Sequence, residues 1–195
     1  MEKIRTFIAI ELPARVKGEL SSTQMRLREA TSCPARWVSA EGMHLTLCFL
    51  GEVSQAQIDT VKGVMTESAA HFPAFSLSLG NPGVFPSLRQ PQIVWVGIQG
   101  SQAVLDGLHK SLEGSLRVIG YKPEGRSFSP HLTLARVRPE ADITACANLA
   151  TALGILQGCA SVTWQVTEIS LMKSQLGHGG AVYTHLYSSR LGPAS

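Results

Sequence analysis

Charge is scarce in this 195-residue sequence, and long hydrophobic runs are absent. Charged residues make up only 16% of the chain, against 44% hydrophobic residues, a balance that argues for an ordered globule rather than a disordered chain. Nowhere do eighteen apolar residues follow one another, so we expect no membrane span. The opening strand-like run ends at Glu11 and Pro13, which does not fit a secretory signal peptide.

Cysteine is equally sparse. Cys33, Cys48, Cys146 and Cys159 form neither a C-x-x-C pair nor a zinc-like spacing. A chain of this length buries roughly 70% of its unfolded surface on folding, so it needs no disulfide or structural metal. We therefore expect a reduced, cytoplasmic protein without metal or cofactor.

Several catalytic signatures are also missing. The sequence contains no Walker A or Rossmann glycine pattern, no G-x-S-x-G elbow and no H-E-x-x-H zinc motif. These absences argue against nucleotide triphosphate hydrolysis, hydride transfer, a serine nucleophile and zinc chemistry. The net charge of +3 and the pI near 8.8 fit a phosphate-bearing ligand, but they fall short of a duplex-binding protein.

One four-residue phrase occurs twice, as His44-Leu45-Thr46-Leu47 and as His131-Leu132-Thr133-Leu134. In a β-strand, successive side chains point to opposite faces. Each copy therefore places its histidine and threonine on one face and its two leucines on the other. We expect the leucines to be buried and the His/Thr pairs to face a shared space.

The rest of the chain keeps the same spacing, because His131 follows His44 by 87 residues and the neighbouring element types fall into register at that offset. The pattern predicts a duplicated strand-helix-strand-helix-strand unit. We expect one bilobal domain over residues 1–195, with repeat 1 at about 5–80 and repeat 2 at about 92–188. Such a duplication would bring the two His/Thr faces together across one groove.

Periodicity and turn residues place the individual elements. Ser54 and Gln57 form a capping box at the start of a helix. The expected strands are 6–12, His44 to Leu50 with a stop at Gly51, 75–79 before a turn at 80–83, 93–98, one long strand 162–172, and 181–187 as its hairpin partner. Helices are expected after Pro13, after Ser54, through Leu105 to Leu116, and from Pro139 to Leu153, with a linker at 86–91.

Two histidines facing each other indicate proton transfer, because imidazole titrates near neutral pH. In-line displacement at phosphorus needs a base behind the attacking oxygen and an acid behind the leaving oxygen. Thr46 and Thr133 can each donate a hydroxyl hydrogen bond to a phosphate oxygen. No Asp or Glu lies in either motif, so the site suits a phosphodiester.

Four segments resemble one known family: RTFIAIELP, WVSAEGMHLTLCFLGEV (37–53), FSPHLTLAR (128–136) and 174–183. They are similar to the two-histidine phosphoesterases, closest to the RNA 2′,3′-cyclic phosphodiesterases, also called 2′-5′ RNA ligases (LigT-like). The resemblance covers nearly the whole chain. It implies a bilobal α+β fold, with antiparallel sheets lining a groove, and metal-independent opening of a 2′,3′-cyclic phosphate to a 2′-phosphate, with reversible ligation as a further activity.

The resemblance also implies residue roles. His44 is expected to be the proton donor and His131 the proton acceptor, although the near-symmetry of the site does not fix that order chemically. Arg136 matches a position that contacts substrate phosphate. It lies five residues after His131, so it faces the groove only if a bulge or the strand end interrupts the alternation.

The alternative is a non-catalytic module that holds a nucleotide or an RNA end in the same groove. As partners we expect RNA ends or small 2′,3′-cyclic nucleotides, no membrane and no obligatory protein, and we expect a monomer. Trp37 and Tyr183 can stack a base or simply pack. His178 can contact substrate or lie in a plain turn, and the basic residues Arg89, Lys122 and Arg126 can steer RNA or simply be solvated. We expect His71, His109 and His185 on solvated faces.

Overall fold

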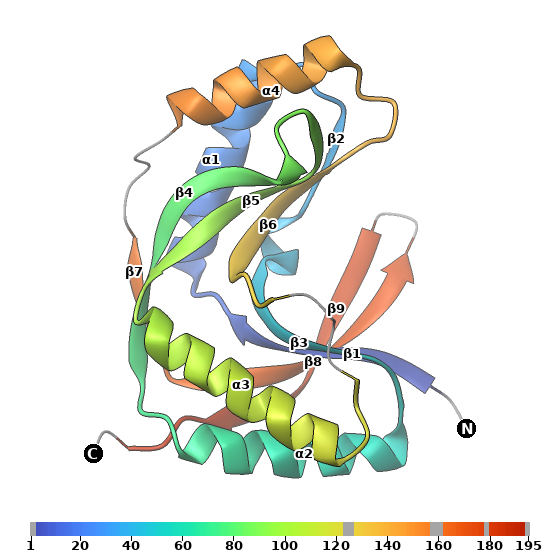
Figure 1. The fold of residues 1–195 in the computed structure, drawn as a ribbon, viewed down its shortest axis with the longest axis vertical. Helices are drawn as coiled ribbons and strands as arrows, with labels where there is room; N and C mark the ends of the chain where they lie inside the picture. Colours follow the sequence, from blue (N-terminus) through green and yellow to red (C-terminus); the bar gives the residue numbers. More distant parts are fainter. Residues whose placement is uncertain (1–2, 123–126, 157–161, 178–179, 194–195) are drawn as a thin grey trace.

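The computed structural model describes residues 3–122, 127–156, 162–177 and 180–193 (Figure 1). In these ranges the elements are β1 Lys3–Glu11, α1 Ala14–Ala30, β2 Ala35–Trp37, the 3-10 helix η1 Ala40–Gly42, β3 His44–Ser54, α2 Gln55–Ala70, β4 Phe75–Ser87, β5 Gln90–Gly100, α3 Gln102–Val118, β6 His131–Val137, α4 Ile143–Ile155, β7 Thr163–Val166, β8 Glu168–Gly177 and β9 Gly180–Arg190.

Two antiparallel sheets form the centre of the molecule. One has the order β3-β1-β8-β9 and the other the order β2-β6-β5-β4-β7. Each sheet contains strands from both halves of the chain: β8 and β9 join β1 and β3, whereas β2 and β4 join β5, β6 and β7. Helices α1 and α4 lie together at one end, and α2 and α3 lie together at the other (Figure 1). The predicted α+β class with antiparallel sheets is confirmed.

The sequence forms these helices for local reasons. In α3 the leucines at three- and four-residue steps, Leu105 to Leu116, are all buried, so one face of the helix is apolar. At the start of α2, Ser54 and Gln57 make the reciprocal hydrogen bonds of the predicted capping box. This cap satisfies two backbone N–H groups that a helix start leaves without partners.

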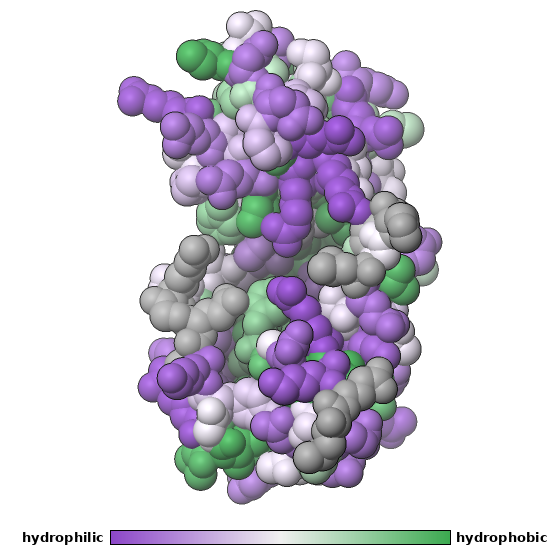
Figure 2. Space-filling view, turned by 90° about the vertical axis from the view of Figure 1, so that its right-hand side faces the viewer, coloured by the Kyte–Doolittle hydropathy of each residue, from purple (hydrophilic) through white to green (hydrophobic). Residues whose placement is uncertain are grey.

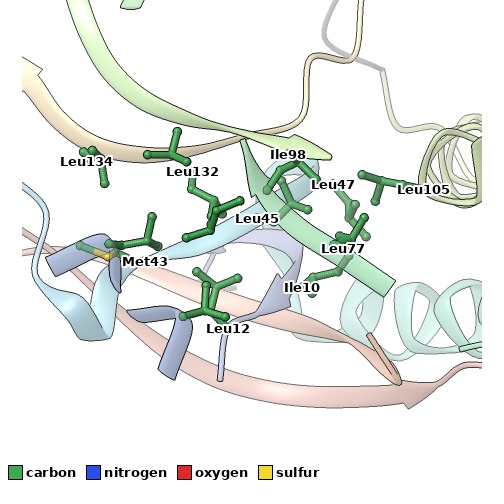
Figure 3. Close-up of a cluster of buried hydrophobic side chains, with 14 of the residues drawn as sticks. Ile10, Leu12, Met43, Leu45, Leu47, Leu77, Ile98, Leu105, Leu132 and Leu134 are labelled. Carbon is green, nitrogen blue, oxygen red and sulfur yellow. The ribbon is translucent and has the colours of Figure 1, made fainter. Parts of the chain in front are cut away.

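The leucines of the two repeated phrases meet in the core between the sheets. Leu45, Leu132 and Leu134 are completely buried and Leu47 is 4% exposed. Figure 3 shows them in one cluster of apolar side chains from both halves, which extends from Leu134 to Leu105. Burying one leucine contributes about 1.5–3 kcal/mol. The alternation that buries these leucines turns the intervening histidines and threonines to the other side.

Several element boundaries differ from the expectations, and four of the differences change the local structure. The strand after His44 continues through Gly51, which adopts a φ of +69° beside a register shift, to Ser54. The expected helix start at Pro139 lies at Asp142, whose carboxylate accepts a hydrogen bond from the N–H of Ala145. The expected linker at 86–91 is the turn of the β4–β5 hairpin. The long strand 162–172 breaks at Thr167 into β7 and β8, which belong to different sheets.

The predicted turn at 80–83 is also wrong, because β4 runs through it. Gly83 lies opposite Trp95 of β5, and a Cβ at Gly83 would come within 2.5 Å of the indole ring. Glycine within a strand commonly marks such a close approach rather than a turn. Among the described residues, no helix combines the length and the apolar character needed to cross a membrane.

Candidate functional site

Both repeated phrases contribute to one groove of about 1140 Å³ between the sheets. Its lining includes His44 and Thr46 from β3, and His131 and Thr133 from β6. Figure 2 shows the hollow in the middle of the molecule, with hydrophilic side chains above and below it. The juxtaposition inferred from the repeat is therefore present in the structure. The groove is larger than a typical pocket for one small ligand, about 300–1,000 Å³.

The two histidine rings are held in the same way. The carbonyl oxygen of Ser129 accepts a hydrogen bond from Nδ1 of His131 at 2.7 Å. His44 likewise donates to the carbonyl of Gly42. Each partner lies two residues before its histidine. A bond of this kind fixes the tautomer and leaves the second ring nitrogen to exchange a proton.

Aromatic side chains flank each histidine. His44 lies against Phe7 at 4.6 Å between ring centroids and meets Tyr183 edge-on at 4.8 Å. His131 meets Phe85 edge-on at 5.0 Å. Trp95 lies 6.5 Å from His131. These contacts restrict ring rotation, so each imidazole points in a defined direction.

Burial lowers the pKa of His44 to about 4; the Gly42 hydrogen bond and the charge of Glu11 oppose the change, and Lys17 adds to it. Burial therefore favours the neutral form of His44 at pH 7. Burial also raises the pKa of the Cys48 thiol in the same groove to about 12. That thiol is protonated at neutral pH and is a poor nucleophile.

Arg136 lines the groove because β6 contains a bulge. Thr133 pairs with Trp95 and Ala135 with Val94, so Leu134 is an extra residue between two paired positions. The insertion changes the alternation, and Arg136 returns to the side of His131 and Thr133. The sequence predicts that Arg136 faces the groove only if a bulge or the strand end interrupts the alternation, and the structure contains such a bulge.

A buried glutamine supports the bulge. The carbonyl oxygen of Leu134 accepts hydrogen bonds from the N–H of Val38 at 2.9 Å and from Nε2 of Gln24 at 2.7 Å. The same amide donates to the carbonyl of Val38 at 2.8 Å. Gln24 is 8% exposed. It therefore satisfies buried carbonyls at the point where the ladder is interrupted.

β3 carries the same bulge at Leu47, the residue equivalent to Leu134, since Thr46 pairs with Ala9 and Cys48 with Ile8. Phe49 therefore occupies the position equivalent to Arg136. It also lines the groove, and it is 47% exposed. The two walls of the groove thus match in backbone and histidine placement but differ here, one presenting an aromatic ring and the other a guanidinium group.

The groove carries more positive than negative side chains. Four cationic residues line it: Arg5, Arg36, Lys122 and Arg136. Glu113 also lines it, but its carboxylate is paired with Arg117 at 3.4 Å. Glu11 pairs with His44 in the β1–β3 ladder, so an acidic residue does lie beside one motif. The lining as a whole favours an anionic ligand.

The remaining sequence candidates have mixed outcomes. His109 was expected on a solvated face, and this is wrong: its ring stacks on Phe128 at 4.0 Å and lines the groove, because α3 packs beside the segment that precedes β6. Trp37, Tyr183 and Lys122 line the groove, whereas Arg89 lies exposed at the β4–β5 turn. His71 and His185 are exposed, and His185 contacts Ser188 at 2.8 Å. His178, Arg126 and Cys159 fall outside the described residues.

Sequence reasoning missed Gln24, Arg36 and Phe49. Phe49 was detectable in principle, as the residue equivalent to Arg136 after an 87-residue shift from position 49 to position 136. Gln24 and Arg36 gave no signal, because their roles depend on contacts between elements distant in sequence.

A metal site is not apparent in the residues that the structure describes. Within those ranges, no three side chains of the His, Cys, Asp and Glu types are grouped closely enough to hold an ion. The functional groups that face the groove are instead imidazoles, hydroxyls and guanidinium groups. Together they can donate and accept protons on opposite sides of a bound anion and can bind its oxygens.

The comparisons with known proteins agree with this geometry. Two sheets that each present a His/Thr pair to one groove define a protein of the two-histidine type. A model of the 2′-5′ RNA ligase superfamily matches residues 16–178, and the chain belongs to this superfamily.

Three relatives illustrate the likeness. The chain is 31% identical over 189 residues to the RNA 2′,3′-cyclic phosphodiesterase of Methanothermobacter thermautotrophicus, covering 97% of this chain and 100% of the relative. It is 33% identical over 165 residues to the enzyme of that name from Aeropyrum pernix, covering 83% and 91%. The crystal structure of E. coli LigT complexed with 3′-AMP superposes with a TM-score of 0.75 at 28% identity, covering 97% of this chain and 99% of that one.

Proposed function

We propose that this protein is an RNA 2′,3′-cyclic phosphodiesterase that opens the cyclic phosphate at an RNA end to a 2′-phosphate. The observation that carries the proposal is the placement of His44 and His131 in one groove, each ring fixed by the carbonyl two residues before it. The relatives named RNA 2′,3′-cyclic phosphodiesterase support it, as does the solved LigT complex with a nucleotide.

In the proposed reaction, water attacks phosphorus and the bond from phosphorus to the 3′ oxygen breaks. His131 accepts the proton of the water, and His44 donates a proton to the leaving 3′ oxygen. Thr46, Thr133 and Arg136 bind the non-bridging oxygens as negative charge develops on them. The order of donor and acceptor follows the family resemblance. If the 5′ hydroxyl of a second RNA attacks phosphorus in place of water and the same bond to the 3′ oxygen breaks, the product is a 2′-5′ linkage.

The lowered pKa of His44 fits this role when the substrate is considered. A donor must carry a proton, but burial of His44 favours its neutral form. A bound phosphate anion favours the charged imidazolium and raises its pKa. His44 therefore takes up its proton together with the substrate.

Phe49 and Arg136 orient the substrate in this scheme. The histidines and threonines alone would accept a nucleotide in two orientations related by the repeat. The aromatic ring on one wall offers a stacking surface for a base, and the guanidinium on the other offers hydrogen bonds to phosphate. A nucleotide that uses both has one orientation.

We further propose a monomeric, cytoplasmic protein that needs no metal.

The test is hydrolysis of an oligonucleotide ending in a 2′,3′-cyclic phosphate, with EDTA present and with the product identified as 2′- or 3′-phosphate. We expect a 2′-phosphate product. Each of His44→Ala and His131→Ala should lower kcat by about 10²–10⁴. The control is His71→Ala, which changes an exposed histidine outside the groove lining.

Three results would contradict different parts of the proposed function. Full activity in either groove variant would overturn the assigned pair, and loss of activity with EDTA would require a metal. Tight binding of the cyclic end without turnover would support the alternative, a non-catalytic module that holds an RNA end.

A further inference from the structure

Arg36 and Arg136 lie directly opposite each other on paired strands. The β2–β6 register pairs Arg36 with Arg136, and both side chains line the groove. Directly opposite residues have Cβ atoms about 4.5–5.5 Å apart, and like charges at such positions destabilise a sheet. The pairing therefore has a cost that the fold itself does not explain.

No carboxylate relieves this repulsion in the described ranges. The ion pairs found there join Lys62 to Asp59, Arg117 to Glu113, Arg138 to Glu140, and His185 to Glu11. Both arginines are exposed to the groove rather than packed in the core. Two guanidinium groups side by side, without a protein counter-charge, form a favourable site for oxyanions.

The two arginines lie on strands at different distances from the His131 motif. Arg136 lies on β6, the strand that also carries His131 and Thr133, and so belongs to the reacting centre. Arg36 lies on β2, at the outer edge of the five-stranded sheet, one strand farther from β5. The volume of about 1140 Å³ also exceeds the range typical of one small ligand.

From this arrangement we propose that Arg36 binds a second phosphate, the phosphodiester on the 5′ side of the terminal nucleotide. The inference rests on the proposed cyclic phosphodiesterase function and specifies its substrate class. An RNA end carries this phosphodiester beside the ribose that bears the cyclic phosphate, whereas a nucleoside 2′,3′-cyclic monophosphate lacks it. Arg36 is thus a specificity residue that favours RNA ends over free cyclic mononucleotides.

The experiment uses substrates that differ only at the 5′ position. Adenosine 2′,3′-cyclic phosphate is compared with the same molecule carrying a methyl phosphodiester at the 5′ oxygen, which mimics the RNA chain, and with one carrying a 5′-phosphate monoester. We expect the full-length protein to prefer the methyl diester by about tenfold in kcat/KM, the effect of one charge-assisted hydrogen bond. A preference for the monoester over the methyl diester would overturn the inference, because it would show that Arg36 recognises the terminal phosphate of a free nucleotide and not an RNA chain.

Variants assign the preference to a residue. Arg36→Gln should lower kcat/KM for the methyl diester about tenfold more than for the unsubstituted substrate, and Arg36→Lys should restore part of the difference. Arg136→Gln should lower both values together. The matched control is Arg190→Gln, an exposed arginine outside the groove lining, which should leave both values unchanged. Loss of one phosphate contact should also reduce the slope of log KM for the diester against log salt concentration by about 0.7–1.

Failure of this inference is separate from failure of the proposed function. If the wild-type protein hydrolyses none of the three substrates and does not hydrolyse the oligonucleotide either, the proposed function is wrong. Equal hydrolysis of the substrates leaves the function intact and removes the second phosphate site. Equal loss on both substrates in Arg36→Gln would assign Arg36 to the reacting phosphate instead. Thermal unfolding of each variant checks that the fold is retained.

Discussion

Leu47 and Leu134 are each the extra residue of a β-bulge, one in β3 and the other in β6, at equivalent positions of the two repeats. Both side chains enter the core, where they are 4% and 0% exposed. The bulges place Phe49 and Arg136 on the groove side, although the regular alternation of a strand would place them on the opposite side. Two core leucines thus determine which residues can meet a ligand.

The bulge in β6 should depend on Gln24. Gln24→Met keeps the shape of the side chain but removes both hydrogen bonds, leaving the carbonyl of Val38 without this donor. We expect the free energy of unfolding to fall by about 1–3 kcal/mol in a urea titration. The kcat/KM for cyclic substrates should fall as well, because Arg136 is no longer held toward the groove. Gln165→Met changes an exposed amide and should alter neither quantity; a stability loss with unchanged kinetics would separate Gln24 from Arg136.

Binding of phosphate should shift the titration of His44. In the free protein the pKa of His44 is about 4, below the usual 6.5, because burial favours the neutral ring. A bound anion favours the charged ring, so the pKa of His44 should rise in saturating inorganic phosphate. By linkage, phosphate affinity should then increase as the pH falls through the range between the free and bound pKa values. NMR titration of the imidazole signals measures both states, with His71 as the internal reference; an unchanged His44 curve would contradict coupled protonation.

Phe49 should contribute to binding rather than to chemistry. Stacking of one base on an aromatic ring is worth about 1–3 kcal/mol, so Phe49→Ala should raise KM for cyclic nucleotides roughly tenfold and leave kcat nearly unchanged. Phe49→Tyr should retain most of the affinity, because the ring is preserved. Val118→Ala changes an apolar residue that is 86% exposed and lies outside the groove lining, and it serves as the control. A loss confined to kcat would place Phe49 in the reaction itself.

The leucines between the sheets should hold both motifs in place. Leu45→Ala and Leu132→Ala each remove a completely buried side chain and should lower the free energy of unfolding by about 2–5 kcal/mol. Because strands from both halves share each sheet, we expect one cooperative unfolding transition in both variants. Fluorescence and circular dichroism that report separate transitions would indicate lobes that unfold independently.

Local sequence signals predicted the parts of the fold that depend on short-range patterns. The leucine spacing located α3, the Ser54–Gln57 pair located the start of α2, and the β8–β9 hairpin follows its predicted pairing. The repeated phrase also predicted that histidines and threonines from both repeats line one groove. These features depend on periodicity, caps and alternation, which are properties of neighbouring residues.

Other features depend on which strands become neighbours in space. Gly83 resembles a turn residue in sequence, but it lies in a strand under the ring of Trp95. His109 comes directly after Leu108 of the buried face of α3, so the sequence predicts that it is solvated. In the structure its ring stacks on Phe128, which lies outside α3. The pairing of Arg36 with Arg136 could be predicted only if the strand order were known. The three residues of β2 are too few to show a strand pattern in the sequence.

The path of the chain links the two strands that carry His44 and His131 through both sheets. The backbone passes from the four-stranded sheet to the five-stranded one and back more than once, and the last passage occurs at Thr167. Several connections, rather than a single linker, therefore join the two walls of the groove. Because both halves of the chain contribute to each wall, the groove is a product of the whole fold and not of an interface between two separate lobes.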